Sequence, residues 1–334
     1  IDSRLMGMFG ALALIWLGFH FYGLIFKGFG AMLTPRNLWN LSVQTSSIGI
    51  MATGMVLVIV SRNIDLSVGA LVGVTGMTMG ILQVDIFPQY LGLGHPMMWV
   101  VTAICGILIG TGIGMFHGWL ISYRGIPAFI VTLGGLLVWR GTAFLANNGK
   151  TISPLDDNFK LLGGGPYGTI GATGSWIVGV LACIVIVYML INGRGKRIAH
   201  GFPTRPMWGE VTVGGLSCSM VLGSVLLVNS YPWPKGIVKQ YAAANDIIVP
   251  AEGIFISHGF AIPVLILVTV GILMTVLVNR TRFGRNVFAI GGNPEAAELA
   301  GINVKWMTLK IFALMGALAG LAGVVASARL NSAT

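Results

Sequence analysis

The sequence predicts an all-α polytopic membrane protein, and three observations carry that prediction. Of its 334 residues, 55% are hydrophobic and only 9% are charged. Soluble domains carry roughly 25% charged residues, so a water-soluble fold could not cover its surface with so few charges. The apolar residues also fall into about nine runs, each of the length that a helix needs to cross a bilayer.

The predicted spans are separated by short segments that hold most of the charged residues. In chain order they cover residues 6–26, 41–61, 66–84, 97–121, 127–146, 174–192, 210–229, 255–279 and 307–328. The first run is too long for the core of a signal peptide. The fifth and ninth each contain one cation, Arg140 and Lys310, whereas the eighth lies in a stretch without charged residues, 253–279. Because the chain begins at Ile1 and ends at Thr334 soon after an apolar run, we expect a fragment whose C-terminal part is missing.

Lys and Arg predict the orientation, because cytoplasmic loops of membrane proteins are enriched in both. If the N-terminus is cytoplasmic, the cytoplasmic side holds eleven of them: Arg4, Arg62, Arg124, Arg194, Lys196, Arg197, Arg205, Arg280, Arg282, Arg285 and Lys305. The outer side holds six: Lys27, Arg36, Lys150, Lys160, Lys235 and Lys239. The net charge of +10 arises from 20 basic against 10 acidic residues. Because the basic residues lie mostly in short gaps between apolar runs, we expect membrane lipid as a partner and no nucleic acid.

One long polar segment, residues 280–306, carries a helix signature between the last two spans. Asn293 is a good N-cap and Pro294 suits the first helical position. Glu295 complements the helix dipole, and Gly301 can end the helix in a left-handed conformation. We therefore predict a helix of about two turns, which is too short to be stable alone in water. It packs either on the protein's own surface or in a groove of a partner.

Three motifs resemble those of one transporter family and follow one another along the chain in the order of that family. Glu295-Ala-Ala-x-x-x-Gly301 is similar to the EAA signature of ATP-binding-cassette importer permeases. Asn63-Ile-Asp-Leu-Ser-Val-Gly69, after Gly54-Met-Val-Leu-Val-Ile59, resembles the ribose/xylose/galactoside-type sugar permeases. So does Gly125-Ile-Pro-Ala-Phe-Ile-Val-Thr-Leu-Gly134, which is followed by Arg140-Gly141. The additional stretch 192–253 resembles the xylose permease branch.

The resemblance implies a type II-importer-like helical bundle, with residues 1–334 forming a single permease domain in a bacterial inner membrane. It also implies a permease homodimer, separate ATPase subunits and a periplasmic or extracellular sugar-binding protein. The chain itself would not be an enzyme and would hold no cofactor, and it contains no phosphate-binding loop. The expected ATPase-coupling residues lie in the 280–306 loop: Gly292, Asn293, Pro294, Glu295, Ala296, Ala297, Glu298 and Gly301.

Polar residues in the spans are candidates for a translocation path, because a sugar needs hydrogen bonds without charge. The candidates are Gln44, Ser46, Ser47, Asp65 and Thr132. Hydrogen bonding between helices is the alternative role for such side chains. For Asp65 the alternative is an N-cap at the membrane edge. Arg140 either snorkels to the interface or clamps the outer gate or binds the partner protein. We expect His20 and His117 to pack in the core rather than to relay protons.

Two further features have alternative explanations. The loop 147–173 is rich in Gly, Pro and Asn and carries Asp156 and Asp157, which suggests a docking surface for a soluble delivery protein. Glycines recur at a spacing of four in Gly106, Gly110 and Gly114. That spacing lets membrane helices approach closely, either within one subunit or at a dimer face.

The sequence leaves rival functions open. An ion-coupled secondary transporter would usually place acids or histidines deep in its spans, and these spans hold few. A branched-chain amino-acid importer permease of the same fold would need a site for a zwitterion, and no such charge pair is evident. A membrane enzyme would need a catalytic constellation, and none is present. Cys105, Cys183 and Cys218 are not spaced as metal ligands, so we expect no metal site.

Overall fold

A computed structural model describes residues 3–92, 94–247, 250 and 253–333. Within these residues the chain is helical and holds no strand, only isolated bridges. Nine of the described helical segments are long and apolar enough to cross a membrane. They are α1 (Ser3–Lys27), α2 (Pro35–Val60), α3 with its continuation (Val68–Leu91), α5 (Met98–Arg124), α6 (Ala128–Ala146), α8 (Gly171–Ala199), α9 (Met207–Asn229), α11 (Ile262–Arg280) and α14 (Val304–Leu330). The prediction of an all-α polytopic protein is therefore confirmed.

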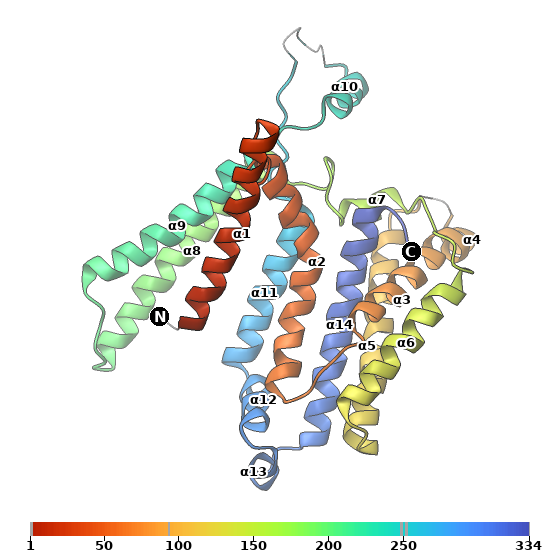
Figure 1. Cartoon of the computed structure of the whole chain (residues 1–334), viewed down its shortest axis with the longest axis vertical. Helices are drawn as coiled ribbons and strands as arrows, with labels where there is room; N and C mark the ends of the chain where they lie inside the picture. Colours follow the sequence, from red (N-terminus) through yellow and green to blue (C-terminus); the bar gives the residue numbers. More distant parts are fainter. Residues whose placement is uncertain (1–2, 93, 248–249, 251–252, 334) are drawn as a thin grey trace. The chain divides into compact units, whose positions relative to one another are not determined.

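Short helices occupy several of the connections between spans (Figure 1). They are α7 (Asp157–Leu161), α10 (Lys235–Ala244), α12 (Arg282–Gly292) and α13 (Pro294–Leu299). The third span continues from α3 (Val68–Ile81) through a π-helical turn, η1 (Leu82–Ile86), into α4 (Phe87–Leu91). Of these short helices only α13 was expected from the sequence.

The chain divides into two compact units, 1–42 with 169–260 and 43–168 with 261–334. In the second unit α14 is the central helix, with 72% of its span buried. It packs against α3 and α5, and α6 packs against α3 (Figure 1). The expectation of one single permease domain stays a prediction.

Glycines let α5 and α14 approach so closely that their backbones touch. A β-carbon at Gly110 would collide with the carbonyl oxygen of Gly316, and one at Gly114 would collide with that of Phe312. The reverse holds too, because a β-carbon at Gly316 would meet the Gly110 carbonyl. Of the two roles considered for these glycines, the structure confirms packing within one subunit.

In the first unit α8 and α9 pack against each other. Gly179 leaves room for Val225, and Arg194 forms an ion pair with Glu210 at 3.0 Å. The segment before α11 is paired instead of helical: the N–H of Trp233 donates to the Ile256 carbonyl at 2.7 Å. The eighth span therefore begins at 262 and not at 255, because these residues exchange backbone hydrogen bonds with the chain that follows α9.

Candidate functional site

The described structure forms the short helix that the sequence predicts between the last two spans. The side-chain oxygen of Asn293 accepts hydrogen bonds from the backbone N–H groups of Glu295 and Ala296, at 3.0 and 3.2 Å. Pro294 is the first residue of α13. Gly301 follows the helix with a φ of +84°, the left-handed conformation that glycine adopts without strain. The predicted cap and stop of this helix are both present.

The surface of α13 is accessible to a partner. Ala297 is buried against the bundle, while the side chains of Glu295 and Glu298 are exposed. Leu299 is 90% exposed at the end of the helix. A helix of six residues gains little stability from its own hydrogen bonds, so α13 depends on Ala297, on its cap and on the neighbouring α12. It is a small, acidic and partly apolar projection.

Arg62 ties the end of α2 to the carbonyl end of α12. Its Nε and Nη2 atoms donate to the carbonyl oxygens of Gly291 at 2.7 Å and Gly292 at 2.6 Å. The last carbonyls of a helix have no partner inside it, and a cation there complements the helix dipole. A β-carbon at Gly291 would collide with the carbonyl oxygen of Val60. The backbone of α12 therefore contacts the end of α2 directly, and Arg62 holds it there.

A buried polar network follows directly after Arg62. Asp65, Ser67 and His117 are 5%, 0% and 2% exposed. Both the backbone N–H and the hydroxyl of Ser67 donate to Asp65 Oδ1, at 2.9 and 2.6 Å. Ser67 Oγ lies 3.3 Å from His117 Nδ1 on α5, and Trp139 Nε1 on α6 donates to His117 Nε2 at 2.9 Å.

The chemistry of these groups determines which atom donates in each hydrogen bond of the network. A tryptophan N–H can only donate, so His117 Nε2 accepts and the neutral ring carries its proton on Nδ1. His117 therefore donates to Ser67, and Ser67 donates to Asp65. The expected N-cap role of Asp65 is wrong, because the capping position of α3 is Ser67 and the Asp65 carboxylate closes the turn before it. The network joins the 62–67 connection to α5 and α6.

The predicted path residues lie in different parts of the second unit. Thr132 is buried on α6, where its hydroxyl donates to the Ala128 carbonyl at 2.8 Å and also lies 3.2 Å from the Ile64 carbonyl, next to Asp65. Ser46 is buried, Ser47 is half-buried and Gln44 is exposed. Ser46 precedes the end of α2 at Val60 by fourteen residues, about 21 Å of helix. The assignment of these residues to a path stays a prediction, and Asp65 and Thr132 are the two that the fold brings together.

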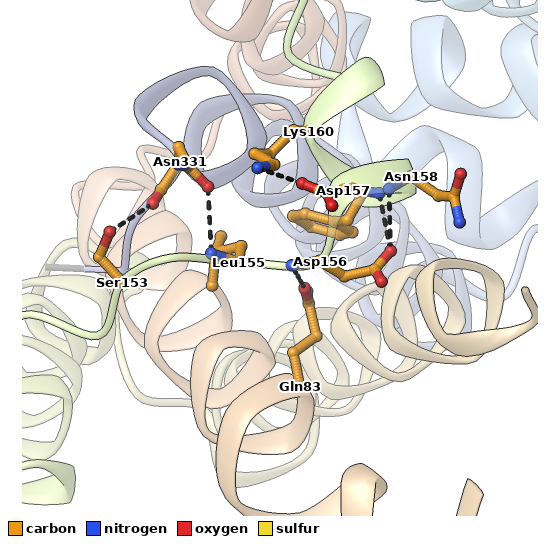
Figure 2. Close-up of polar contacts among 9 residues, drawn as sticks. Gln83, Ser153, Leu155, Asp156, Asp157, Asn158, Lys160 and Asn331 are labelled. Atoms are coloured by element: carbon orange, nitrogen blue, oxygen red, sulfur yellow. Dashed lines mark hydrogen bonds and ion pairs between the residues drawn. The ribbon is translucent and has the colours of Figure 1, made fainter. Parts of the chain in front are cut away.

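The loop before α8 is held on the C-terminal end of α14, as Figure 2 shows. The Asn331 side chain accepts from the Leu155 N–H at 3.0 Å, and its carbonyl accepts from the Ser153 hydroxyl at 3.0 Å. Gln83 Oε1 accepts from the Asp156 N–H at 3.1 Å. These contacts fix the position of α7.

The two aspartates of this loop have different roles. Asp156 Oδ1 accepts from the N–H groups of Asn158 and Phe159, both at 3.1 Å, and so caps α7 (Figure 2). The Asp157 side chain is 92% exposed and is paired with Lys160. Asp157 is therefore available to a partner, whereas the carboxylate of Asp156 is committed to the helix.

Sequence reasoning missed Arg62, Ser67 and Trp139 as members of a site, and it expected His117 to be a packing residue. His117 does lie in the core, but as the centre of the polar network. His20, in the first unit, accepts from the Leu33 N–H at 3.3 Å. Arg62 directly precedes the Asn63–Gly69 motif and Ser67 lies within it, so this motif was the sequence signal that could have pointed to both residues.

Comparison with known proteins gives consistent matches over most of the chain. Residues 37–334 match the family described as "Branched-chain amino acid transport system / permease component". The xylose transport system permease protein of Escherichia coli (strain K12) is 35% identical over 91% of this chain and 67% of its own length. That of Haemophilus influenzae (strain ATCC 51907 / DSM 11121 / KW20 / Rd) is 37% identical over 91% and 71%. The ribose import permease protein of Escherichia coli (strain K12) is 27% identical over 90% and 64%. No solved structure matches.

Proposed function

Because the chain belongs to the family described as "Branched-chain amino acid transport system / permease component", we propose that it is the membrane subunit of an ATP-driven importer for a pentose, xylose first. The observation that carries the proposal is α13. It is a capped, exposed helix between the last two spans, and its companion α12 is fastened to the bundle by Arg62. A soluble ATPase subunit that docks on α13 would therefore push on α12 and on the end of α2.

The relatives support a sugar over an amino acid as cargo. The relatives at 35% and 37% identity are both named as xylose permeases. A branched-chain amino acid carries a carboxylate and an ammonium group, and an ammonium group buried without a partner is costly. Among the described residues Asp65 is the buried acid, and it lies in the 62–67 connection with its Oδ1 already occupied by Ser67.

The partners follow from the predicted orientation, with the N-terminus in the cytoplasm. Two ATPase subunits would dock on the α13 helices of a permease homodimer. A soluble sugar-binding protein would dock on the opposite side of the inner membrane, at α7. There the exposed Asp157 is the acid that a basic patch of the partner would meet.

The proposed mechanism begins when ATP closes the ATPase subunits and displaces α13. The displacement reaches α12, whose last two carbonyls hold Arg62. Arg62 begins the non-helical connection 62–67, and that connection is hydrogen-bonded through Asp65 and Ser67 to His117 on α5 and through His117 to Trp139 on α6. Tightly packed elements switch between arrangements rather than deform gradually. One displacement would therefore move α3, α5 and α6 together.

Sugar-stimulated ATP hydrolysis by the complete complex in nanodiscs tests this proposal. Leu299→Glu and Glu295→Ala change the exposed surface of α13, and we expect them to abolish stimulation while the permease still inserts. Phe202→Glu is the matched control, because Phe202 is an exposed apolar residue on the same predicted side and outside α13. Full stimulation in the Leu299→Glu complex would contradict docking at α13.

One observation favours the ion-coupled alternative, the buried Asp65–Ser67–His117 chain. Acids and histidines inside membrane proteins often relay protons. That alternative predicts uptake that collapses when the proton gradient is dissipated and that needs no ATPase subunit. Uptake that persists with a protonophore and requires ATP would exclude it.

A further inference from the structure

A cavity of about 550 Å³ opens between α3 and α6 in the second unit. Its α3 wall contains Gly69 and Gly73, and its α6 wall contains Arg140 and Phe144. The loop that follows α6 contributes Lys150 and Thr151 to the lining. The volume is in the range of small-molecule sites, about 300–1,000 Å³.

The lining is mostly apolar, and its polar side chains are Arg140, Lys150 and Thr151 beside the ring of Phe144. A guanidinium offers five N–H donors in a planar fork and an ammonium offers three, while the Thr151 hydroxyl can both donate and accept. Phe144 offers an apolar surface for the C–H groups of a ligand. None of the lining residues is acidic. A cationic ligand would therefore face two like charges, and an amino acid would find no carboxylate for its ammonium group.

Glycine on α3 keeps this space open. A β-carbon at Gly69 or at Gly73 would meet no other atom within 4 Å. The two glycines are four residues apart and so lie on the same side of α3. Neighbouring atoms require neither of them to be glycine, in contrast to Gly110 and Gly114 on α5, where backbones touch. A β-carbon at Gly73 would therefore enter open space beside the cavity.

Both walls of the cavity are adjacent in sequence to residues of the buried hydrogen-bond network around His117. Ser67, which hydrogen-bonds Asp65, directly precedes the first residue of α3. Trp139, which donates to His117, directly precedes Arg140 on α6. A displacement of the 62–67 connection would therefore reach the start of the α3 wall and the middle of the α6 wall.

We propose that this cavity is the binding site for the uncharged sugar during its passage through the permease. The inference rests on the proposed function and adds a location and a ligand class to it. Arg140 and Lys150 donate to the sugar hydroxyls, Thr151 donates or accepts, and Phe144 packs against the ring. Arg140 is in that case a ligand-binding residue rather than a snorkelling one.

Uptake kinetics of the complete complex in proteoliposomes, with xylose as the probe, test the proposal. Gly73→Leu fills the cavity, and we expect uptake to fall at least tenfold while the complex still assembles. Arg140→Gln should raise the KM for xylose several-fold. Gly112→Leu is the matched control, because Gly112 is a helical glycine on α5 with no atom within 4 Å of its β-carbon position. It should stay within twofold of wild type. Wild-type kinetics in Gly73→Leu would overturn the proposal.

A second measurement reports on the cavity without transport. In a variant free of the three native cysteines, Thr151→Cys would be labelled with a membrane-impermeant maleimide in the presence and absence of xylose. We expect xylose to slow the labelling at least threefold, and to leave Asn158→Cys, an exposed position on α7, unchanged.

The two measurements separate the failure of the site from the failure of the function. Protection without ATP-driven uptake would support the cavity and contradict the proposed importer. ATP-driven uptake without protection of Thr151→Cys would support the proposed importer and contradict the cavity as the sugar site. Stronger protection by xylonate than by xylose would overturn the uncharged ligand class, because two cations would then be selecting a carboxylate.

Discussion

At the scale of single residues, Arg62 combines an unfavourable backbone conformation with favourable side-chain hydrogen bonds to α12. Its φ of +60° lies in the left-handed region, which costs a non-glycine residue roughly 1–2 kcal/mol. That conformation directs the chain away from α2, and the side chain reaches carbonyls 229 and 230 residues further on. Each hydrogen bond from a charged donor contributes roughly 1.5–3 kcal/mol, enough to offset the strain.

Substitution of Arg62 separates these two effects. Arg62→Gly relieves the backbone and removes both hydrogen bonds, whereas Arg62→Lys keeps a charge but loses the forked geometry. We expect Arg62→Gly to retain expression and ATP hydrolysis but to lose at least nine-tenths of sugar uptake per ATP hydrolysed. The ratio of uptake to hydrolysis in proteoliposomes measures this loss. A ratio in Arg62→Gly equal to that of wild type would show that Arg62 transmits nothing.

His258 gives a residue-scale prediction in the first unit. Its ring stacks on Tyr231 with centroids 4.2 Å apart, and its Nδ1 donates to the Tyr231 carbonyl at 3.1 Å. Burial lowers the pKa of His258, and the hydrogen bond to Tyr231 only partly opposes that effect. The unfolded segment therefore binds a proton at higher pH than the folded one does. The contribution of His258 to stability is complete above pH about 6.5 and is lost as the pH falls below it.

Hydrogen exchange of the Trp233 amide, which donates to the Ile256 carbonyl in the same cluster, measures that loss. After correction for intrinsic exchange, protection should decrease from pH 7 to pH 5. In His258→Gln the side chain cannot titrate, so protection should vary much less over the same range. Equal pH dependence in the two proteins would assign the effect to another group.

At the scale of helices, the predictable elements are those whose cause is local. Apolar length alone predicts the spans, and the cap and stop of α13 follow from Asn293, Pro294 and Gly301. The helices α10 and α12 lie in segments that are too polar or too glycine-rich to appear as spans. The start of α11 at Ile262 depends on hydrogen bonds with residues near 231–233, which no local pattern reveals.

The close contact of α5 with α14 predicts a large stability difference between two glycines of α5. In Gly114→Ala the new methyl would collide with the Phe312 carbonyl, and overpacking of this kind costs about 1–3 kcal/mol. In Gly112→Ala the methyl meets no atom within 4 Å, so no such cost arises. Thermal unfolding in detergent should show a lower Tm for Gly114→Ala only. Equal Tm values would show that the helices lie further apart.

Asp156 and Asp157 of the α7 region are expected to differ in their effects on stability and on partner binding. Asp156→Ala removes the helix cap, which costs roughly 0.5–2 kcal/mol, and should disturb the loop held by Gln83 and Asn331. Asp157→Lys reverses an exposed charge and removes the ion pair with Lys160, and an exposed ion pair contributes little to stability. We expect Asp157→Lys to weaken binding of the sugar-binding protein, measured by surface plasmon resonance on nanodiscs, with no change in Tm. Unchanged binding would move the docking surface elsewhere.

At the scale of the whole molecule, the sequence predicts the class of protein better than its site. Three motifs in order, from Gly54 to Gly301, resemble one permease family, and residues 37–334 match the permease family described above. The site depends on contacts between residues far apart in sequence, such as Ser67 with His117 and Arg62 with Gly292. No periodicity or propensity encodes which distant partners meet. The motif therefore identified Asp65 while its partners stayed unknown.

The central claim is that this chain carries a pentose across the membrane with ATP as the energy source. The most direct test measures xylose uptake into proteoliposomes that contain the permease, its ATPase subunits and the sugar-binding protein, with a protonophore present. The account predicts uptake with ATP, none without ATP or without the ATPase subunits, and at least a tenfold loss in Leu299→Glu. Uptake that needs no ATPase subunit and disappears with the ion gradient would contradict it.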